Sequence, residues 1–210
     1  MPGRAFLRRL IDLTIGLLRP QHHTRLTKET KLDLMVWKEF LLQFNGRSFF
    51  LENRWDQTDP LTLYTDSSGA IGFGAIFGNN WCHGIWPEEW QYQNIAVLEF
   101  YPIVLSLYLW GSDMSNKCIT FFTDNNALVS VINRCTCKDK LLMQFVRKMV
   151  LICLKHNILF KAKHIPGVKN DLADALSRQQ IKQFRRMAPA HLKIQPTTIP
   201  LELQPQNWVL

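Results

Sequence analysis

The chain has 210 residues, of which 47% are hydrophobic and 11% aromatic, and its net charge at pH 7 is +8. This composition is sufficient for a packed core and excludes a wholly disordered chain, and the length indicates one domain with extensions or at most two small domains. The positive charge favours a polyanionic partner, nucleic acid above all.

The cysteines and the apolar segments exclude further classes. Five cysteines, an odd number without C-x-x-C spacing, indicate neither a disulfide framework nor a zinc site, and they fit a reducing compartment. No apolar run reaches the roughly 18 residues of a membrane span. The basic start of the chain is better explained as a packing helix than as a transit peptide, because its leucines recur at helical spacing. We therefore expect a protein that is not secreted and does not bind a membrane, and the basic charge suggests the cytoplasm or the nucleus without deciding between them.

Residues 1–58 are predicted to form a small helical region. A first helix should run to about residue 18, and a second should span about 28–44 after the basic link QHHTRLTKET. Thr27 is the expected N-cap of the second helix, and Asn45-Gly46 is a natural stop.

Residues 59–180 alternate strands and helices. LTLYT, IGFGAIFG and WCHGIW are predicted to be three consecutive strands. An apolar helix at 96–110, the strand CITFFT, helices at about 125–133 and 139–155, the strand ILFKAKHI and a last helix follow. This order predicts an α/β fold, a mixed five-stranded sheet flanked by helices.

Residues 181–210 contain four of the ten prolines and are predicted to be an extended linker or tail. A basic bias precedes and enters this segment, with nine Lys or Arg between residues 155 and 193 against only Asp171 and Asp174. It indicates either a solvated helix face or, the reading that we favour, a phosphate-contacting surface that includes Lys161 and Lys163.

Four acids occupy positions where acidic residues are uncommon. Asp66 and Asp124 end predicted strands, Glu99 lies inside an otherwise almost wholly apolar helix, and Asp174 lies about one turn into the last helix. If the strands that end in Asp66 and Asp124 are parallel neighbours, both carboxylates meet at the sheet edge where α/β proteins place ligands. A buried glutamate with no basic residue in its own helix needs a partner, and a metal ion is one.

Carboxylates without a histidine or cysteine pair favour Mg²⁺ or Mn²⁺ bound by oxygen. Two such ions can activate a water and stabilise the leaving oxygen in phosphodiester hydrolysis. Each acid also has a simpler explanation, since strand-end aspartates form turns and Asp174 can offset the helix dipole. The four acids together favour a two-metal site.

The motifs around these acids resemble those of a known family. TDSSGAIGFGA, LEFYPIVLSL, TDNNALVSVI and HIPGVKNDLADALSR are similar to a type I ribonuclease H domain, with the acids in the order D-E-D-D. GRAFLRRLIDLT, WKEFLLQFNGRSFF and FRRMAP add a narrower resemblance to the ribonuclease H region of DIRS-type retrotransposon polyproteins, over about residues 3–200. The resemblance implies a ribonuclease H-like sheet preceded by a helical remnant of the polymerase connection.

The resemblance also implies roles for particular residues. Asp66, Glu99, Asp124 and Asp174 would bind the two metal ions. His164, ten residues before Asp174, would assist proton transfer or product release, although a local hydrogen bond in its loop is the alternative. Contacts with the nucleic acid would come from Ser67, Gly69, Gly72, Gly74, Asn125, Asn126 and Asn170.

The glycines among these residues suit a close approach of another backbone, and an ordinary turn or bulge explains them nearly as well. The asparagines would read the 2′-hydroxyl or the minor groove of a hybrid. Some family members insert a basic protrusion after the helix that follows Asp124, and here only about five residues, RCTCK, occupy that place. Substrate grip would therefore fall to the basic segment 155–193 or to a polymerase region.

Two hypotheses from different classes follow. The first is a metal-dependent endonuclease that hydrolyses the RNA strand of RNA–DNA hybrids, with a fused or separate polymerase region as a partner. The second is a catalytically silent nucleic-acid-binding or spacer remnant of a retrotransposon polyprotein. Another nuclease or transposase relative of the same fold is a third reading, and the order of the acids argues against it.

Overall fold

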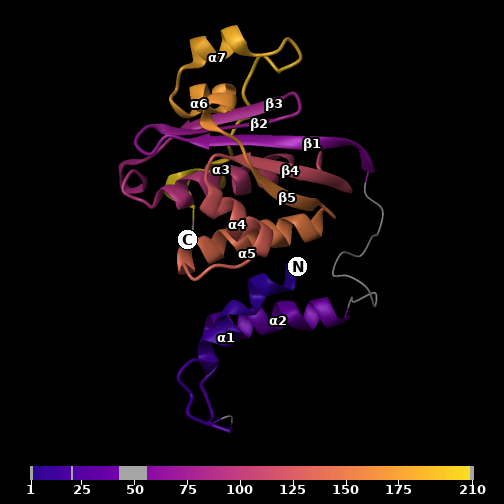
Figure 1. The fold of residues 1–210 in the computed structure, drawn as a ribbon, viewed down its shortest axis with the longest axis vertical. Helices are drawn as coiled ribbons and strands as arrows, with labels where there is room; N and C mark the ends of the chain where they lie inside the picture. Colours follow the sequence, from indigo (N-terminus) through magenta and orange to yellow (C-terminus); the bar gives the residue numbers. More distant parts are fainter. Residues whose placement is uncertain (1, 20, 43–55, 209–210) are drawn as a thin grey trace.

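The computed structural model describes residues 2–19, 21–42 and 56–208 and has a five-stranded sheet at its centre (Figure 1). The strand order is β3-β2-β1-β4-β5. β1, β2 and β3 pair antiparallel, whereas β1, β4 and β5 pair parallel, so the sheet is mixed. The strands are β1 (Asp56–Ser67), β2 (Gly72–Phe77), β3 (Asn80–Ile85), β4 (Lys117–Thr123) and β5 (Leu159–His164).

Helices cover both faces of the sheet (Figure 1). One face carries α3 (Ile95–Trp110), α4 (Asn126–Arg134) and α5 (Lys140–Lys155). The other carries α6 (Asp171–Ser177), on which α7 (Ile181–Met187) packs. The predicted fold class, a mixed five-stranded sheet flanked by helices, is confirmed, and β1 begins earlier than the sequence predicts.

The strand pairing divides the side chains of the sheet between its two faces. Leu63 of β1 pairs with Phe121 of β4, and both are fully buried against the helices on the α3 face. The next residues along, Tyr64 and Phe122, point to the opposite face and stack with ring centroids 5.0 Å apart. α3 is buried along almost its whole length, because it lies between the sheet and α5.

The N-terminal region consists of η1 (Pro2–Phe6), α1 (Arg8–Thr14) and α2 (Lys28–Leu42), and it lies against α5 (Figure 1). α1 ends four residues before the predicted boundary at residue 18, since Ile15 is extended and Gly16 has a φ of +85°. The cap of α2 is confirmed, because the Thr27 hydroxyl accepts a hydrogen bond from the Thr30 amide. Residues 43–44 and the expected stop at Asn45-Gly46 lie outside the described residues.

The C-terminal segment differs from the predicted linker or tail. It contains α7, and the chain beyond α7 packs against the sheet and α3. The Thr197 amide donates to the Trp81 carbonyl at 2.7 Å, and the Tyr101 hydroxyl donates to the Leu203 carbonyl at 2.6 Å. Trp208 is 7% exposed and joins the main core. The prolines keep the segment extended, and the aromatic contacts hold it in place; the division of the chain at residues 58 and 180 stays a prediction.

The described helices are all too short or too polar to cross a membrane.

α6 lies unusually close to β2 because Gly74 has no side chain. A Cβ on Gly74 would overlap the Cβ of Leu176 and lie 3.0 Å from the carbonyl oxygen of Ala173. Gly74 is also the register partner of Asp66 in β1. The absence of a side chain at residue 74 therefore allows α6 to lie beside the end of β1.

We expect Gly74→Ala to lower the free energy of unfolding by about 1–3 kcal/mol, the usual cost of overpacking a rigid contact. Gly69→Ala is the matched control, because the nearest atom to its Cβ would be 4.0 Å away. Urea unfolding of both variants measures the difference. Equal stability of the two variants would contradict the packing role of Gly74.

Candidate active site at the edge where the strands end

Asp66 and Asp124 lie at the same edge of the sheet. β1 and β4 are parallel neighbours in which Tyr64 pairs with Phe122, so the two aspartates lie at the same level two residues further on. Asp66 is half-buried, whereas Asp124 is exposed just beyond the end of β4. The expectation that these strands are parallel neighbours is confirmed.

Glu99 reaches this edge from α3. It is 8% exposed, and its Oε2 accepts a hydrogen bond of 2.9 Å from the hydroxyl of Thr123, the residue before Asp124. Burial raises the pKa of Glu99 to about 8, and the negative charges of Asp124 and Asp66 act in the same direction against the opposing hydrogen bond from Thr123. The helix thus holds a carboxyl group whose negative charge is poorly compensated.

Ser177 and Arg178 bring α6 into the same group of acids. The Ser177 hydroxyl donates to Asp66 Oδ2 at 2.6 Å, and Arg178 Nε lies 2.8 Å from Asp174 Oδ1. Burial raises the pKa of Asp66 to about 6; the hydrogen bond from Ser177 opposes this shift, while the charges of Asp124 and Asp174 add to it. Asp66 therefore lies close enough to interact electrostatically with each of the other three predicted acids.

The chemistry of this donor set fits a divalent metal ion. The four side chains offer only carboxylate oxygens, and a cation would offset the burial and the repulsion that together raise the pKa values of Glu99 and Asp66. As the side chains stand, no group of three or more His, Cys, Asp or Glu in the described chain is arranged around a common point to hold an ion. Asp66 and Asp174 are engaged by Ser177 and Arg178 instead. The metal-binding roles of the acids remain a prediction.

His164 and the two lysines lie on β5, the neighbour of β4. His164 ends the strand as the register partner of Thr123, which places it at the same edge as Asp124. It is exposed, and within the described residues neither a hydrogen bond nor an ion pair joins it to the acids. Lys161 and Lys163 are exposed on β5 opposite Thr120 and Phe122. They form a basic strip on the sheet face that also carries α6.

The three predicted asparagines have different surroundings. Asn125 is the N-cap of α4, since its Oδ1 accepts from the Leu128 amide at 3.1 Å. Asn126 is exposed at the first position of α4. Asn170 begins α6 without a side-chain cap, contrary to the capping role that its position suggests. It is 3% exposed, and its amide donates instead to the Thr65 carbonyl at 3.0 Å, which ties α6 to the residue before Asp66.

Ser67 and the three glycines lie along the turn from β1 into β2 and along β2 itself. The Ser67 hydroxyl donates to the Leu98 carbonyl at 2.8 Å, which fixes the end of β1 against α3 beside Glu99. Gly72 faces the backbone of Gly84, and Gly74 faces α6, so packing within the chain explains both glycines. Gly69 is open to its surroundings. Contact of these residues with a nucleic acid remains a prediction.

Three residues of the site were not predicted: Thr123, Ser177 and Arg178. Each one contacts a predicted acid. Thr123 and Ser177 are 1% and 0% exposed, so both are buried hydroxyl groups, and burial is not visible in the sequence. Arg178 follows Asp174 by four residues, and that spacing does predict an ion pair on one helix face.

Comparisons with known proteins give similarities in fold. No family model matches the sequence, and no curated protein does either. The chain is similar to RNase H1 of Halobacterium salinarum NRC-1, with 14% identity over 60% of this chain and 99% of that chain and a TM-score of 0.48. For LC11-RNase H1 in complex with an RNA/DNA hybrid, the identity is 16% over 59% and 96% of the two chains, with a TM-score of 0.48. For the prototype foamy virus protease–reverse transcriptase, the identity is 8% over 75% and 21%, with a TM-score of 0.33. At these identities and scores the similarities do not place the chain in a family.

The raised pKa of Glu99 gives a pH-dependent stability with a definite sign. Folded Glu99 holds its proton up to about pH 8, whereas the unfolded chain releases it near 4.5, so the folded state binds more protons between these values. In EDTA, the free energy of unfolding should therefore fall as the pH rises from 4.5 to 8. Glu99→Gln keeps an acceptor for Thr123 and should be more stable than the unchanged protein at pH 8, on the order of a few kcal/mol.

Urea unfolding at several pH values measures this slope. Asp171→Asn is the control, because Asp171 is an exposed acid of α6 that has no part in the group. It should keep the slope of the unchanged protein. A Glu99→Gln variant with the same pH dependence as the unchanged protein would show that Glu99 does not hold the proton.

Proposed function

We propose that this protein is a metal-dependent endonuclease that hydrolyses the RNA strand of RNA–DNA hybrids. The observation that carries the proposal is the group of mutually repelling carboxylates at the edge where β1 and β4 end, with Glu99 buried among them. A buried group of this kind with perturbed pKa values is typical of a functional site. The resemblance of the surrounding motifs to type I ribonuclease H domains supports the same function. Their narrower similarity to DIRS-type retrotransposon polyproteins supports a retroelement origin.

Asp66, Glu99, Asp124 and Asp174 would hold two Mg²⁺ or Mn²⁺ ions. When bound, such ions activate a water and stabilise the leaving oxygen of a phosphodiester. Thr123 fixes the carboxylate of Glu99, and Ser177 fixes that of Asp66, so each acid is oriented before an ion arrives. His164 would move a proton at the same edge.

Recognition of the hybrid would fall to groups around this edge. Asn126 and Gly69 are accessible to a strand that crosses the acids, and the basic strip of Lys161 and Lys163 would contact phosphates. Asn125, Asn170 and Ser67 would act mainly by fixing α4, α6 and β1 in position. A polymerase region, fused or separate, would be a partner of residues 1–58.

A silent nucleic-acid-binding remnant is the second candidate, and one observation favours it. Arg178 Nε lies 2.8 Å from Asp174 Oδ1, so this ion pair engages one of the four carboxylates that a metal site would need. For this candidate function, the four acids would no longer bind metal ions or support catalysis, and the basic surface would still bind nucleic acid.

Cleavage of a labelled RNA–DNA hybrid in Mg²⁺ separates the two candidates. We expect Asp124→Asn and Asp174→Asn to lower the cleavage rate at least about 100-fold, because each removes a carboxylate that would hold a metal ion. Asp171→Asn, three residues before Asp174 on α6, should cleave at the unchanged rate. Binding of the hybrid without Mg²⁺-dependent cleavage would favour the silent remnant, and equal cleavage by Asp124→Asn would overturn the proposed catalytic site.

Mg²⁺ should also stabilise the protein at pH 8. A cation that binds only the folded state adds free energy of unfolding, and each kcal/mol raises the Tm by about 2–4 °C in a domain of this size. Calorimetry with Mg²⁺ and with EDTA measures the shift. We expect the shift to disappear in Asp124→Asn and to persist in Asp171→Asn; a shift that persists in both variants would place Mg²⁺ elsewhere.

A further inference from the structure

A second charged cavity lies away from the carboxylates, between the N-terminal region and α5. It has a volume of about 410 Å³, and α1, the first turn of α2 and the start of α5 line it. Its walls carry five cationic side chains: Arg8, Arg9, Lys138, Lys140 and Arg147. The acids in the walls are Asp12 and Glu29. This excess of positive charge is suited to an anion and excludes a bare metal cation.

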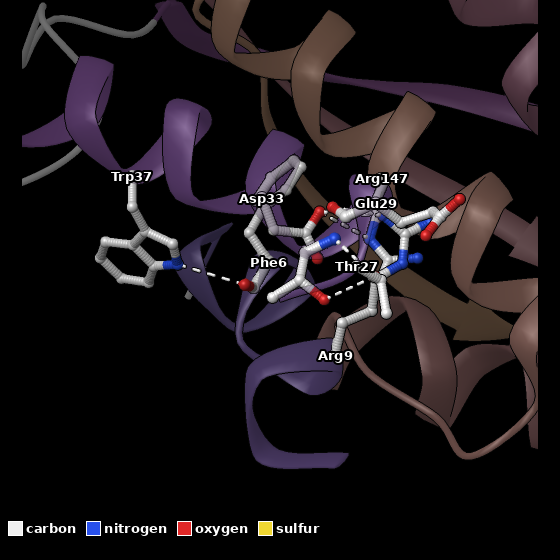
Figure 2. Close-up of polar contacts among 8 residues, drawn as sticks. Phe6, Arg9, Thr27, Glu29, Asp33, Trp37 and Arg147 are labelled. Atoms are coloured by element: carbon white, nitrogen blue, oxygen red, sulfur yellow. Dashed lines mark hydrogen bonds and ion pairs between the residues drawn. The ribbon is translucent and has the colours of Figure 1, made fainter. Parts of the chain in front are cut away.

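Arg147 lines the cavity and is largely buried, and its guanidinium group lies beside Asp33 (Figure 2). Its side chain is 10% exposed, and its Nε lies 3.6 Å from Asp33 Oδ1 without forming a hydrogen bond. Asp33, which is 3% exposed at the side chain, also accepts from Arg9 Nη1 at 3.2 Å. The carboxylate of Asp33 thus lies beside two guanidinium groups, those of Arg9 and Arg147. Burial lowers the pKa of Arg147. A buried guanidinium in this state is a donor without a full set of acceptors.

The rim of the cavity adds further donors. Arg8 pairs with Asp12 through Nη2 at 2.8 Å, while its buried Nε has no hydrogen-bond partner. Lys138 and Lys140 are exposed beside the start of α5, and no ion pair engages either of them within the described residues. The five cations outnumber Asp12, Glu29 and Asp33, so the cavity keeps a positive excess after every internal pair is formed.

The start of α5, which lines the cavity, lies toward the edge of the sheet that carries the candidate active site. The end of α5 lies beside the start of β4, because the Asn116 amide donates to the His156 carbonyl, and α5 then leads directly into β5, which is parallel to β4. α5 therefore runs against the direction of these strands. Its 16 residues span about 24 Å, close to the length of a seven-residue strand, so its first turn lies toward the edge where β4 ends.

We propose that this cavity binds a backbone phosphate of the polynucleotide whose scissile strand lies at the carboxylate edge. The path of that strand rests on the proposed function; the phosphate site itself rests on the cavity. A phosphate oxygen accepts charge-assisted hydrogen bonds from guanidinium groups, and the side chains of Arg8, Arg9 and Arg147 line the cavity. Lys138 and Lys140 would contribute charge at the entrance. The N-terminal region would then grip the substrate together with α5.

Binding of a fluorescently labelled RNA–DNA hybrid to the full chain in EDTA tests the site without any cleavage. We expect Lys138→Ala/Lys140→Ala to weaken binding about 10-fold and to reduce the slope of log Kd against log salt by about 1 or more, the effect of losing phosphate contacts. Lys38→Ala/Lys117→Ala is the control, because it removes the same charge from α2 outside the cavity lining and from the start of β4. The control should bind nearly as tightly as the unchanged protein.

Two further arms identify the anion. Inorganic phosphate should compete with the hybrid for the unchanged protein and compete less well for Lys138→Ala/Lys140→Ala. Phosphatidylserine vesicles should bind both proteins equally, so a loss confined to vesicle binding would overturn the proposal in favour of a membrane surface.

Binding and salt slope equal to those of the unchanged protein, or an equal loss in the control, would also overturn the phosphate site. Because no step of this assay requires hydrolysis, a protein that cleaves nothing can still confirm the site. A protein that cleaves normally can equally refute it.

Discussion

The parallel pairing of β1 with β4 forces two carboxylates to the same edge of the sheet, and the rest of the site compensates for that constraint. Glu99 adds a third carboxyl group from the most deeply buried of the described helices, and this group keeps its proton up to about pH 8. Hydrogen bonds from Thr123 and Ser177 stabilise these charges only in part, as the raised pKa values of Glu99 and Asp66 show. The carboxyl groups at this edge thus lower the stability of the folded protein, and a bound cation would raise it again.

The sequence was sufficient to predict the order of the elements and the meeting of Asp66 with Asp124, because both depend on local pattern and on the geometry of parallel strands. The sequence was insufficient where a contact between residues far apart in the chain determines the role of a side chain. Asn170 has the position of a helix cap, yet its amide binds the carbonyl of Thr65, 105 residues earlier. The crowding around Gly72 and Gly74 was likewise hidden, since the groups that approach them come from β3 and α6.

The contact between the N-terminal region and α5 depends on an unusual arrangement of charge. Asp33 is buried between Arg9 and Arg147, and one of its oxygens, Oδ2, has no hydrogen-bond partner (Figure 2). Buried ion pairs contribute little net stability, but the loss of one partner leaves an expensive isolated charge. Loss of Arg9 or Arg147 would therefore leave Asp33 with less compensation for its buried charge, while Trp37 and Phe6 supply apolar contact area beside it.

The packing of Trp208 has a consequence for the order in which the protein acquires its structure during synthesis. Trp208 contacts Tyr101 of α3 and Phe145 of α5, with ring centroids 5.0 and 6.0 Å away. The packing of α3 is therefore completed only by an aromatic side chain that is synthesised about a hundred residues later. In a chain that is still bound to the ribosome, Phe73, Trp86 and Trp90 would already pack against Tyr101, and the remaining edge of its ring would stay uncovered until residue 208 emerges.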